Sequence, residues 1–133
     1  MDTIGTADPV IVTVTLTREI EPQFLFDTFI AACEGGVNYW ADVTRYHWQN
    51  SDGTDDVYGF SAVLVDQDTG EKHGIGWNAI VGGIRLILSC AVGSSEHWEA
   101  LSQAIADGDD GAADADLADA IVQAGVFGRL IYG

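Results

Sequence analysis

The sequence predicts an α+β fold, in which an antiparallel sheet of three to four strands packs against a helical layer and helices follow at the C-terminal end. Strand patterns and turn residues gather in the first half of the chain, whereas apolar residues at helical spacing gather in the second half. The chain has 133 residues, of which 47% are hydrophobic, so it is long and apolar enough for a single packed domain over residues 1–133. This composition excludes a disordered acidic tail.

A strand and a short helix are expected first. Val10–Thr17 alternates β-branched apolar residues with threonine, which predicts a strand with one buried face. Pro22 fits a first helical turn, and apolar side chains then recur at steps of three and four residues as far as Gly35 and Gly36. This spacing predicts a short amphipathic helix that the two glycines end.

A β-hairpin and one more strand are expected next. Val37–Trp48 and Val57–Asp66 favour extended structure, and the segment between them is rich in Asn, Ser, Asp and Gly. A second turn at Gln67–Gly70 predicts a further strand over Glu71–Ile75. Together these strands predict one antiparallel sheet.

The second half of the chain is predicted to be helical. Asn78 is a suitable cap for a buried helix that runs to about Ala91, and Ser95 for a second helix over Glu96–Ala106. Asp114 or Asp116 is expected to cap a last helix, and acidic residues in that first turn also favour the helix dipole. The chain then ends in an apolar segment, Val126–Gly133, which is expected to dock on the core or on another subunit.

The two cysteines and the N-terminus bear on location. Cys33 and Cys90 each lie in an apolar stretch, which favours two reduced, buried thiols over a disulfide framework. Residues 1–9 have neither a basic region nor an apolar core of the kind that signal peptides require. A cytoplasmic protein is therefore expected.

The net charge restricts the class of partner. The formal charge is −16, because 21 acidic residues face only five basic ones. Such a surface repels nucleic acid and anionic lipid, since both are bound through lysine and arginine. We therefore expect neither a nucleic acid nor a membrane as a direct partner. Solubility in concentrated salt, or a GC-rich genome, would produce the same acidity without any binding role.

Motifs for catalysis are not apparent. The three histidines and two cysteines show none of the spacings of CxxC, HExxH or Gly-x-Ser-x-Gly sites. The aspartates around residue 110 do not match a calcium loop, because the glycine falls at the wrong offset and no glutamate closes the loop. We therefore predict no catalytic residues, no metal site and no cofactor.

Two sequence pieces carry a resemblance. Gly35–Ala41 (GGVNYWA) and Asp114–Gln123 (DADLADAIVQ), followed by Phe127-Gly128 and Tyr132-Gly133, resemble small acidic uncharacterised proteins of phages and prophages of Gram-positive bacteria. The resemblance implies no catalytic residues. It implies a phage context, with the cytoplasm of a host cell as the location, in which small acidic proteins often block host defences.

Three functional hypotheses follow. The first is a non-enzymatic inhibitor of a host nucleic-acid-handling defence system, a restriction or CRISPR effector, which presents an anionic surface that mimics nucleic acid to a basic surface of that host protein. The carboxylates expected to form this surface are Asp52, Asp55, Asp56, Asp107, Asp109, Asp110, Asp114, Asp116 and Asp119.

The second hypothesis is an oligomeric sponge, a homodimer or a higher oligomer, that sequesters a small cyclic nucleotide signal. Aromatic rings would stack the base and arginines would hold the phosphates. The residues assigned to this alternative are Tyr39, Trp40, Arg45, Trp48, Arg85 and Arg129. Period-two alternation puts Trp40, Tyr46 and Trp48 on one face of the hairpin and Tyr39 and Val43 on the other. The third hypothesis is a structural or regulatory phage component.

Overall fold

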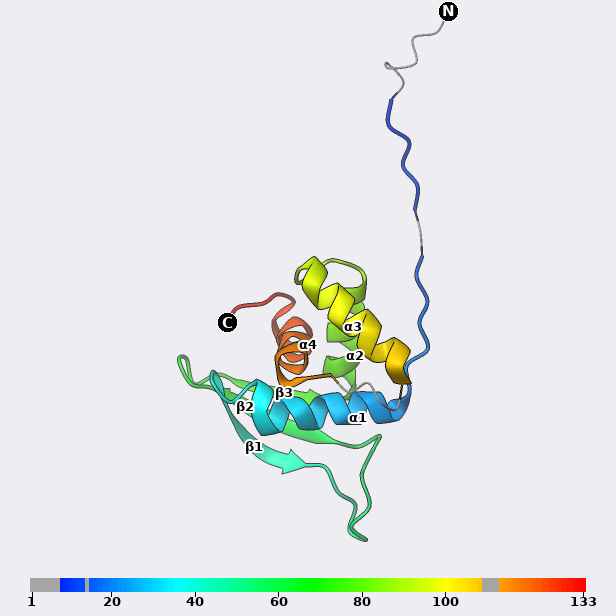
Figure 1. Cartoon of the computed structure of the whole chain (residues 1–133). Coiled ribbons are helices and arrows are strands. Elements are labelled where there is room, and N and C mark those ends of the chain that lie inside the picture. The colour runs from blue at the N-terminus through cyan, green and yellow to red at the C-terminus, as the bar shows by residue number, and fades with distance from the viewer. Residues whose placement is uncertain (1–7, 14, 109–112) are drawn as a thin grey trace, which may run out of the picture.

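A computed structural model describes residues 8–13, 15–108 and 113–133. It has a three-stranded antiparallel sheet and four α-helices, which confirms the α+β class (Figure 1). The elements are, in chain order, α1 (Pro22–Ala31), a π-helical turn (Ala32–Gly36), β1 (Ala41–His47), β2 (Ser61–Asp66), β3 (Lys72–Gly76), α2 (Trp77–Leu88), α3 (Ser95–Asp107) and α4 (Ala115–Phe127). Within the described ranges, no helix has the length and apolar character needed to cross a membrane.

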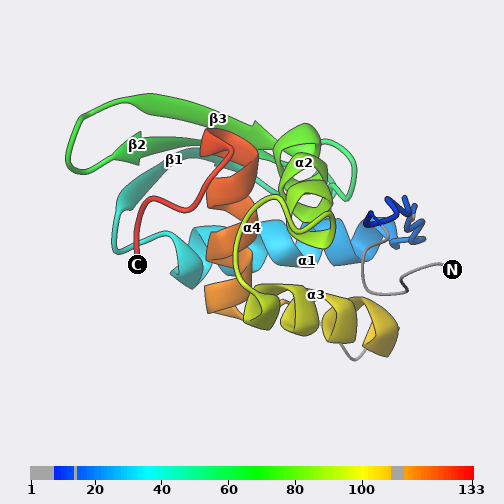
Figure 2. The ribbon, with the colours of Figure 1, turned by 90° about the horizontal axis from the view of Figure 1, so that it is seen from above.

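The sheet has the strand order β1-β2-β3, and the helices cover one of its faces (Figures 1 and 2). Ala41 pairs with Asp66 across the first strand pair, and Ala62 pairs with Ile75 across the second. Inward-facing residues of β2 are buried, among them Leu64, because alternate residues of a strand face opposite sides of the sheet. One layer of helices therefore buries one face only.

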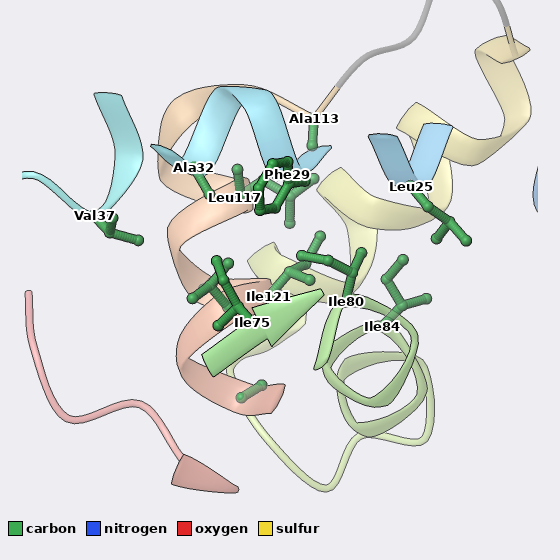
Figure 3. Close-up of a cluster of buried hydrophobic side chains, with 14 of the residues drawn as sticks. Leu25, Phe29, Ala32, Val37, Ile75, Ile80, Ile84, Ala113, Leu117 and Ile121 are labelled. Carbon is green, nitrogen blue, oxygen red and sulfur yellow. The ribbon is translucent and has the colours of Figure 1, made fainter. Parts of the chain in front are cut away.

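The core forms where α1, α2 and α4 meet above the sheet. Phe29 of α1, Ile80 of α2 and Ile121 of α4 are fully buried and point toward one another (Figure 3). The helices α2 and α4 approach each other so closely at Gly83 that a Cβ atom there would collide with the backbone oxygen of Ile121. Gly83, one of the glycines that interrupt the apolar run of α2, thus has a packing function.

The first expected strand does not form. Val10–Thr17 has no regular secondary structure at its described positions, and no backbone hydrogen bond joins these positions to the rest of the described chain. The prediction was wrong because a β-propensity pattern requires a neighbouring strand, and the sheet of a single chain provides none here. The sheet consequently has three strands.

Two of the predicted helix caps lie one or two residues later than the caps in the structure. The N-cap of α2 is Gly76 rather than Asn78, because β3 runs directly into the helix with no intervening loop. The N-cap of α3 is Ser94 rather than Ser95, and its backbone N–H donates to Nδ1 of His97 at 3.0 Å. Asp114 caps α4 as predicted, since its carboxylate accepts from the backbone N–H of Leu117 at 2.8 Å.

The predicted faces of the first hairpin strand were also wrong. Arg45 has a φ of 48°, and the pairing register shifts between Thr44 and His47, which marks a β-bulge. The extra residue turns Tyr46 inward, where its ring centroid lies 5.7 Å from that of Phe29. Tyr46 therefore joins the inner face of the sheet instead of opposing the residues before the bulge.

The C-terminal segment docks on the core, as the sequence predicts. The side-chain oxygen of Gln123 accepts from the backbone N–H groups of Ile131 at 2.8 Å and Tyr132 at 2.9 Å. The Tyr132 ring stacks on the buried indole of Trp40, with a centroid distance of 5.1 Å. Of the two cysteines, Cys33 is buried as expected, whereas Cys90 follows the end of α2 and is exposed.

Candidate acidic binding surface

The turn between β1 and β2 holds three of the predicted surface carboxylates in a hydrogen-bonded frame. Residues Asn50 and Thr54 close the turn through a 2.8 Å backbone hydrogen bond. Asp52 accepts from the backbone N–H of Thr54 at 3.0 Å and from its hydroxyl at 2.6 Å. Asp56 accepts from the backbone N–H of Gly59 at 2.9 Å. We call Asp52, Asp55 and Asp56 the acidic turn.

The hydrogen bonds of the acidic turn also keep it ionised. Donation from Thr54 lowers the pKa of Asp52 below its usual value. The pKa of Asp56 is lowered mainly by the hydrogen bond from His47, at 2.8 Å, and also by the Gly59 N–H. Asp55 is exposed to solvent. At neutral pH the turn therefore presents fixed negative charge.

A second group of carboxylates lies where the start of α1 meets the end of α3. Glu19, Glu21 and Asp27 line a cavity of about 440 Å³ together with Ile105 and other residues of these elements. Asp107, the last residue of α3, is exposed, and its carboxylate accepts from Gln103 at 2.7 Å. This arrangement joins carboxylates that are about 80 positions apart in the chain.

The two groups lie toward the same end of the molecule, with the loop below the sheet and the ends of α1 and α3 at the level of the helices (Figure 1). Figures 1 and 2 both place the β1–β2 loop, the start of α1 and the end of α3 toward the same side. Tyr58 of that loop stacks on Trp77 at 5.6 Å, and Trp77 in turn lines a cavity with Leu25 of α1. We define the acidic surface as the acidic turn together with Glu19, Glu21, Asp27 and Asp107.

No lysine or arginine forms an ion pair within 4.0 Å with the described carboxylates of this surface, although Arg18 and Arg85 line the groove beside Trp77. Among the described residues, the ion pairs within 4.0 Å are His47–Asp56 and His73–Glu71, and neither involves lysine or arginine. The carboxylates are therefore not engaged in a network of structural salt bridges. They remain available to an external cation.

The aspartates of α4 lie elsewhere. The start of α4 packs closely on the π-helical turn that follows α1. A Cβ atom at Gly36 in this turn would lie only 2.5 Å from the backbone oxygen of Ala115. Asp114 and Asp116 are exposed there, at the opposite end of α1 from Glu19. Asp109 and Asp110 lie outside the described residues. The nine predicted carboxylates therefore do not form one continuous patch in the part of the chain that is described.

Asp119 is buried, contrary to its predicted place on the surface. Its carboxylate accepts from the Tyr39 hydroxyl at 2.6 Å, the Trp40 indole N–H at 2.8 Å and the Gln123 amide at 2.9 Å. Burial and the bond to Asp119 raise the pKa of Tyr39 to about 12. Asp119 therefore belongs to an internal hydrogen-bond network and not to a docking surface.

The residues assigned to nucleotide binding do not converge in a single chain. Trp40 is buried under Tyr132, Arg45 occupies the bulge of β1, and Arg85 lines a cavity beside α2. Tyr39 lines a different cavity, of about 510 Å³, at the C-terminal segment. Arg129 is exposed just beyond the end of α4, and Trp48 is half-buried beside Tyr46.

Two features of the described residues concern catalysis, namely the reactivity of the Cys33 thiol and the grouping of side chains that could bind a metal ion. Burial raises the pKa of the Cys33 thiol to about 12, so this thiol is protonated and unreactive at neutral pH. In residues 8–13, 15–108 and 113–133, no group of three or more His, Cys, Asp or Glu side chains is placed to hold a metal ion.

Comparisons of the chain with protein-family models, curated proteins and solved structures give no match.

Sequence reasoning missed Glu19, Glu21 and Asp27 as members of the acidic surface. Asp27 follows Gln23 by four residues, and its carboxylate accepts a hydrogen bond from the Gln23 side-chain amide at 2.9 Å. This helical spacing predicts the polar face of α1 from the sequence. The approach of α3 to this end of α1 is a tertiary contact that has no local signal. These three residues could therefore be found only after the helices were placed.

Proposed function

We propose that the protein is a non-enzymatic binding protein that docks on a basic surface of another protein through its acidic surface. Docking of this kind follows from charge complementarity, which speeds encounter and sets the orientation of the partners. The partner chemistry is a cluster of arginine and lysine side chains spaced for a nucleic-acid backbone.

The observation that carries this proposal is the acidic turn. The carboxylates of Asp52 and Asp56 are fixed by hydrogen bonds to Thr54 and Gly59, so these two side chains lose little conformational entropy when they meet a partner. Asp52 and Asp56 have lowered pKa values, so they remain charged at neutral pH and below. Fixed carboxylates that are not paired with lysine or arginine are what a phosphate-binding groove can accept in place of DNA or RNA.

We also propose a specific class of partner protein. The resemblance to small acidic phage proteins favours a host nucleic-acid-handling defence protein, such as a restriction enzyme or a CRISPR effector. In that setting the protein occupies the groove that otherwise holds nucleic acid. The mode of inhibition is then competition with nucleic acid and not chemical modification of the effector.

Two charge-matched variants test the proposal. The surface variant carries Glu19→Gln, Glu21→Gln and Asp55→Asn, all exposed residues of the acidic surface. The control variant removes the same amount of negative charge from exposed residues elsewhere, at Asp68, Glu96 and Glu99, by the same kind of substitution. Both variants keep the core and the buried Asp119 network intact.

The assay measures displacement of fluorescent double-stranded DNA or guide-bound RNA from purified restriction and CRISPR effectors. We expect the wild type and the control variant to raise the apparent Kd of at least one effector for nucleic acid, and the surface variant to do so at least about tenfold less well. Equal competition by the surface variant and the control variant would contradict the proposal.

A further inference from the structure

The segment before α1 is an exposed apolar arm. Val10, Ile11 and Val12 are 84%, 91% and 76% exposed, and Figure 1 shows the arm leaving the body of the molecule. An extended segment with β-branched side chains has backbone groups ready to pair with another strand. We use the name arm for residues 8–13 and 15–18.

A groove lies between the base of the arm and α2. Its volume is about 900 Å³, and its walls include Leu16 of the arm and Trp77, Val81 and Leu88 of α2. Arg18 and Arg85 also line it, whereas its lining includes no carboxylate. Two of the five basic residues of a chain with charge −16 thus meet in one apolar groove.

These properties specify the occupant. It must bring apolar side chains to α2 and avoid a high negative charge, with at most an isolated carboxylate near the two arginines. Residues 72–95 and 120–133 carry no carboxylate, but they belong to the folded body of the protein. The arm fits, because residues 9–17 are uncharged and the one adjacent carboxylate before them, Asp8, is exposed.

We propose that the arm is a homodimerisation element, exchanged between two copies of this chain. Residues 10–13 of each protomer lie in the groove of the other, antiparallel to residues 15–18 at the base of the other arm. The two contacts are related by a two-fold axis, as is usual for dimers. Backbone pairing of this kind is β-strand addition, with specificity from the alternate side chains.

The pairing satisfies several features at once. Val12 of one protomer lies opposite Leu16 of the other, so the apolar face of each arm gains a partner. The register places Asp8 beyond Arg18, within the part of the groove that holds the two cations.

Sedimentation velocity of the full-length protein tests the dimer. We expect the wild type to sediment as a dimer at micromolar concentration, and Val12→Asp to raise the dimer Kd by about tenfold or more. Val81→Asp, in the groove, should have the same effect. Ile131→Asp is the control, because Ile131 is an exposed apolar residue that lies outside the groove lining.

Cys90 permits an independent test, because this exposed thiol lines the groove. Under mild oxidation, Val12→Cys should form a disulfide-linked dimer with Cys90 of the second copy. The same variant with Cys90→Ser should remain non-covalent. Circular dichroism spectra should be unchanged in all variants that substitute the exposed arm.

Three results would overturn the proposal: a wild-type protein that is monomeric at all concentrations, a dimer that withstands both Val12→Asp and Val81→Asp, or covalent dimers that form equally well without Cys90. The dimer is measured without any effector, so a failed dimer test would leave the proposed function unaffected. A failed displacement assay would likewise leave the dimer proposal unaffected.

Discussion

The indole N–H of Trp40 donates a 2.8 Å hydrogen bond to the carboxylate of Asp119, although the two residues are 79 positions apart in the chain. Tyr39 and Gln123 donate to the same carboxylate, and Gln123 also holds the backbone of the C-terminal segment. One buried aspartate thus joins the segment before β1, helix α4 and the end of the chain. It serves the stability of the fold that presents the acidic surface.

Removing this carboxylate should destabilise the protein strongly. Asp119→Ala leaves the N–H of Trp40, the hydroxyl of Tyr39 and the amide of Gln123 without their acceptor. Trp40 and Gln123 are buried, whereas Tyr39 is exposed. Two buried donors left unsatisfied, at about 1–3 kcal/mol each, give an expected loss of about 2–6 kcal/mol in the free energy of unfolding. Urea denaturation measures it.

Asp116→Asn is the matched control for that substitution. Asp116 is exposed in the first turn of the same helix, where a carboxylate contributes about 0.3–1 kcal/mol through the helix dipole. A loss with Asp119→Ala no larger than the loss with Asp116→Asn would show that the network contributes little.

Two adjacent glycines of α2 should respond in opposite ways to alanine. A Cβ at Gly83 collides with the backbone of Ile121, whereas a Cβ at Gly82 meets no atom within 4 Å. Gly83→Ala must therefore push α4 away and is expected to cost about 2 kcal/mol or more. Gly82→Ala should stabilise the helix by about 0.5–1 kcal/mol. Thermal unfolding of the two variants checks the sign of each effect.

Stability should fall at alkaline pH. The hydrogen bond that the Tyr132 hydroxyl donates to Asp66, at 2.6 Å, and partial burial raise the pKa of Tyr132 to about 12. A tyrosine in the unfolded chain ionises near pH 10. The contribution of this group is therefore complete below about pH 10 and is lost as the pH rises to about 12.

Urea denaturation between about pH 9 and pH 12 measures this dependence. Tyr132→Phe should lower stability at neutral pH and flatten the alkaline decline, because the ionising group is gone. If the wild type and Tyr132→Phe declined in parallel, Tyr132 would not be the source of the effect.

The bulge at Arg45 gives a prediction about backbone strain. A non-glycine residue with a φ of 48° is held in the left-handed region, at a cost of about 1–2 kcal/mol. Arg45→Gly should therefore be more stable than Arg45→Ala by about 1 kcal/mol, since both remove the same side chain. Equal stability of the two variants would indicate that the bulge relaxes.

The fold could be predicted where local chemistry determines it. Apolar spacing located α1 and α4, and the turn residues around Gly53 and at Gln67–Gly70 located the antiparallel strands. The arm was predicted as a strand because its pattern is correct for one, but pairing depends on a neighbour. The bulge at Arg45 changed the faces of β1, and a single unusual φ angle has no sequence signal when the residue is not glycine.

The candidate site was predictable only in part. The acidic turn follows from hairpin chemistry and was located correctly as a turn. Asp119 was expected outside because aspartate is most often exposed, yet three donors from distant residues offset the cost of its burial. Glu19 and Glu21 join the acidic surface only through the packing of α3, which no local pattern specifies.

The dependence of effector affinity on salt tests the central claim most directly. The Kd for a purified effector that the wild type inhibits is measured at several NaCl concentrations, from about 0.05 M to 0.5 M, for the wild type, the surface variant and the control variant. If the acidic surface is the contact, affinity falls steeply with salt for the wild type and the control variant and less steeply for the surface variant. Three identical slopes, or an affinity that salt does not change, would contradict it.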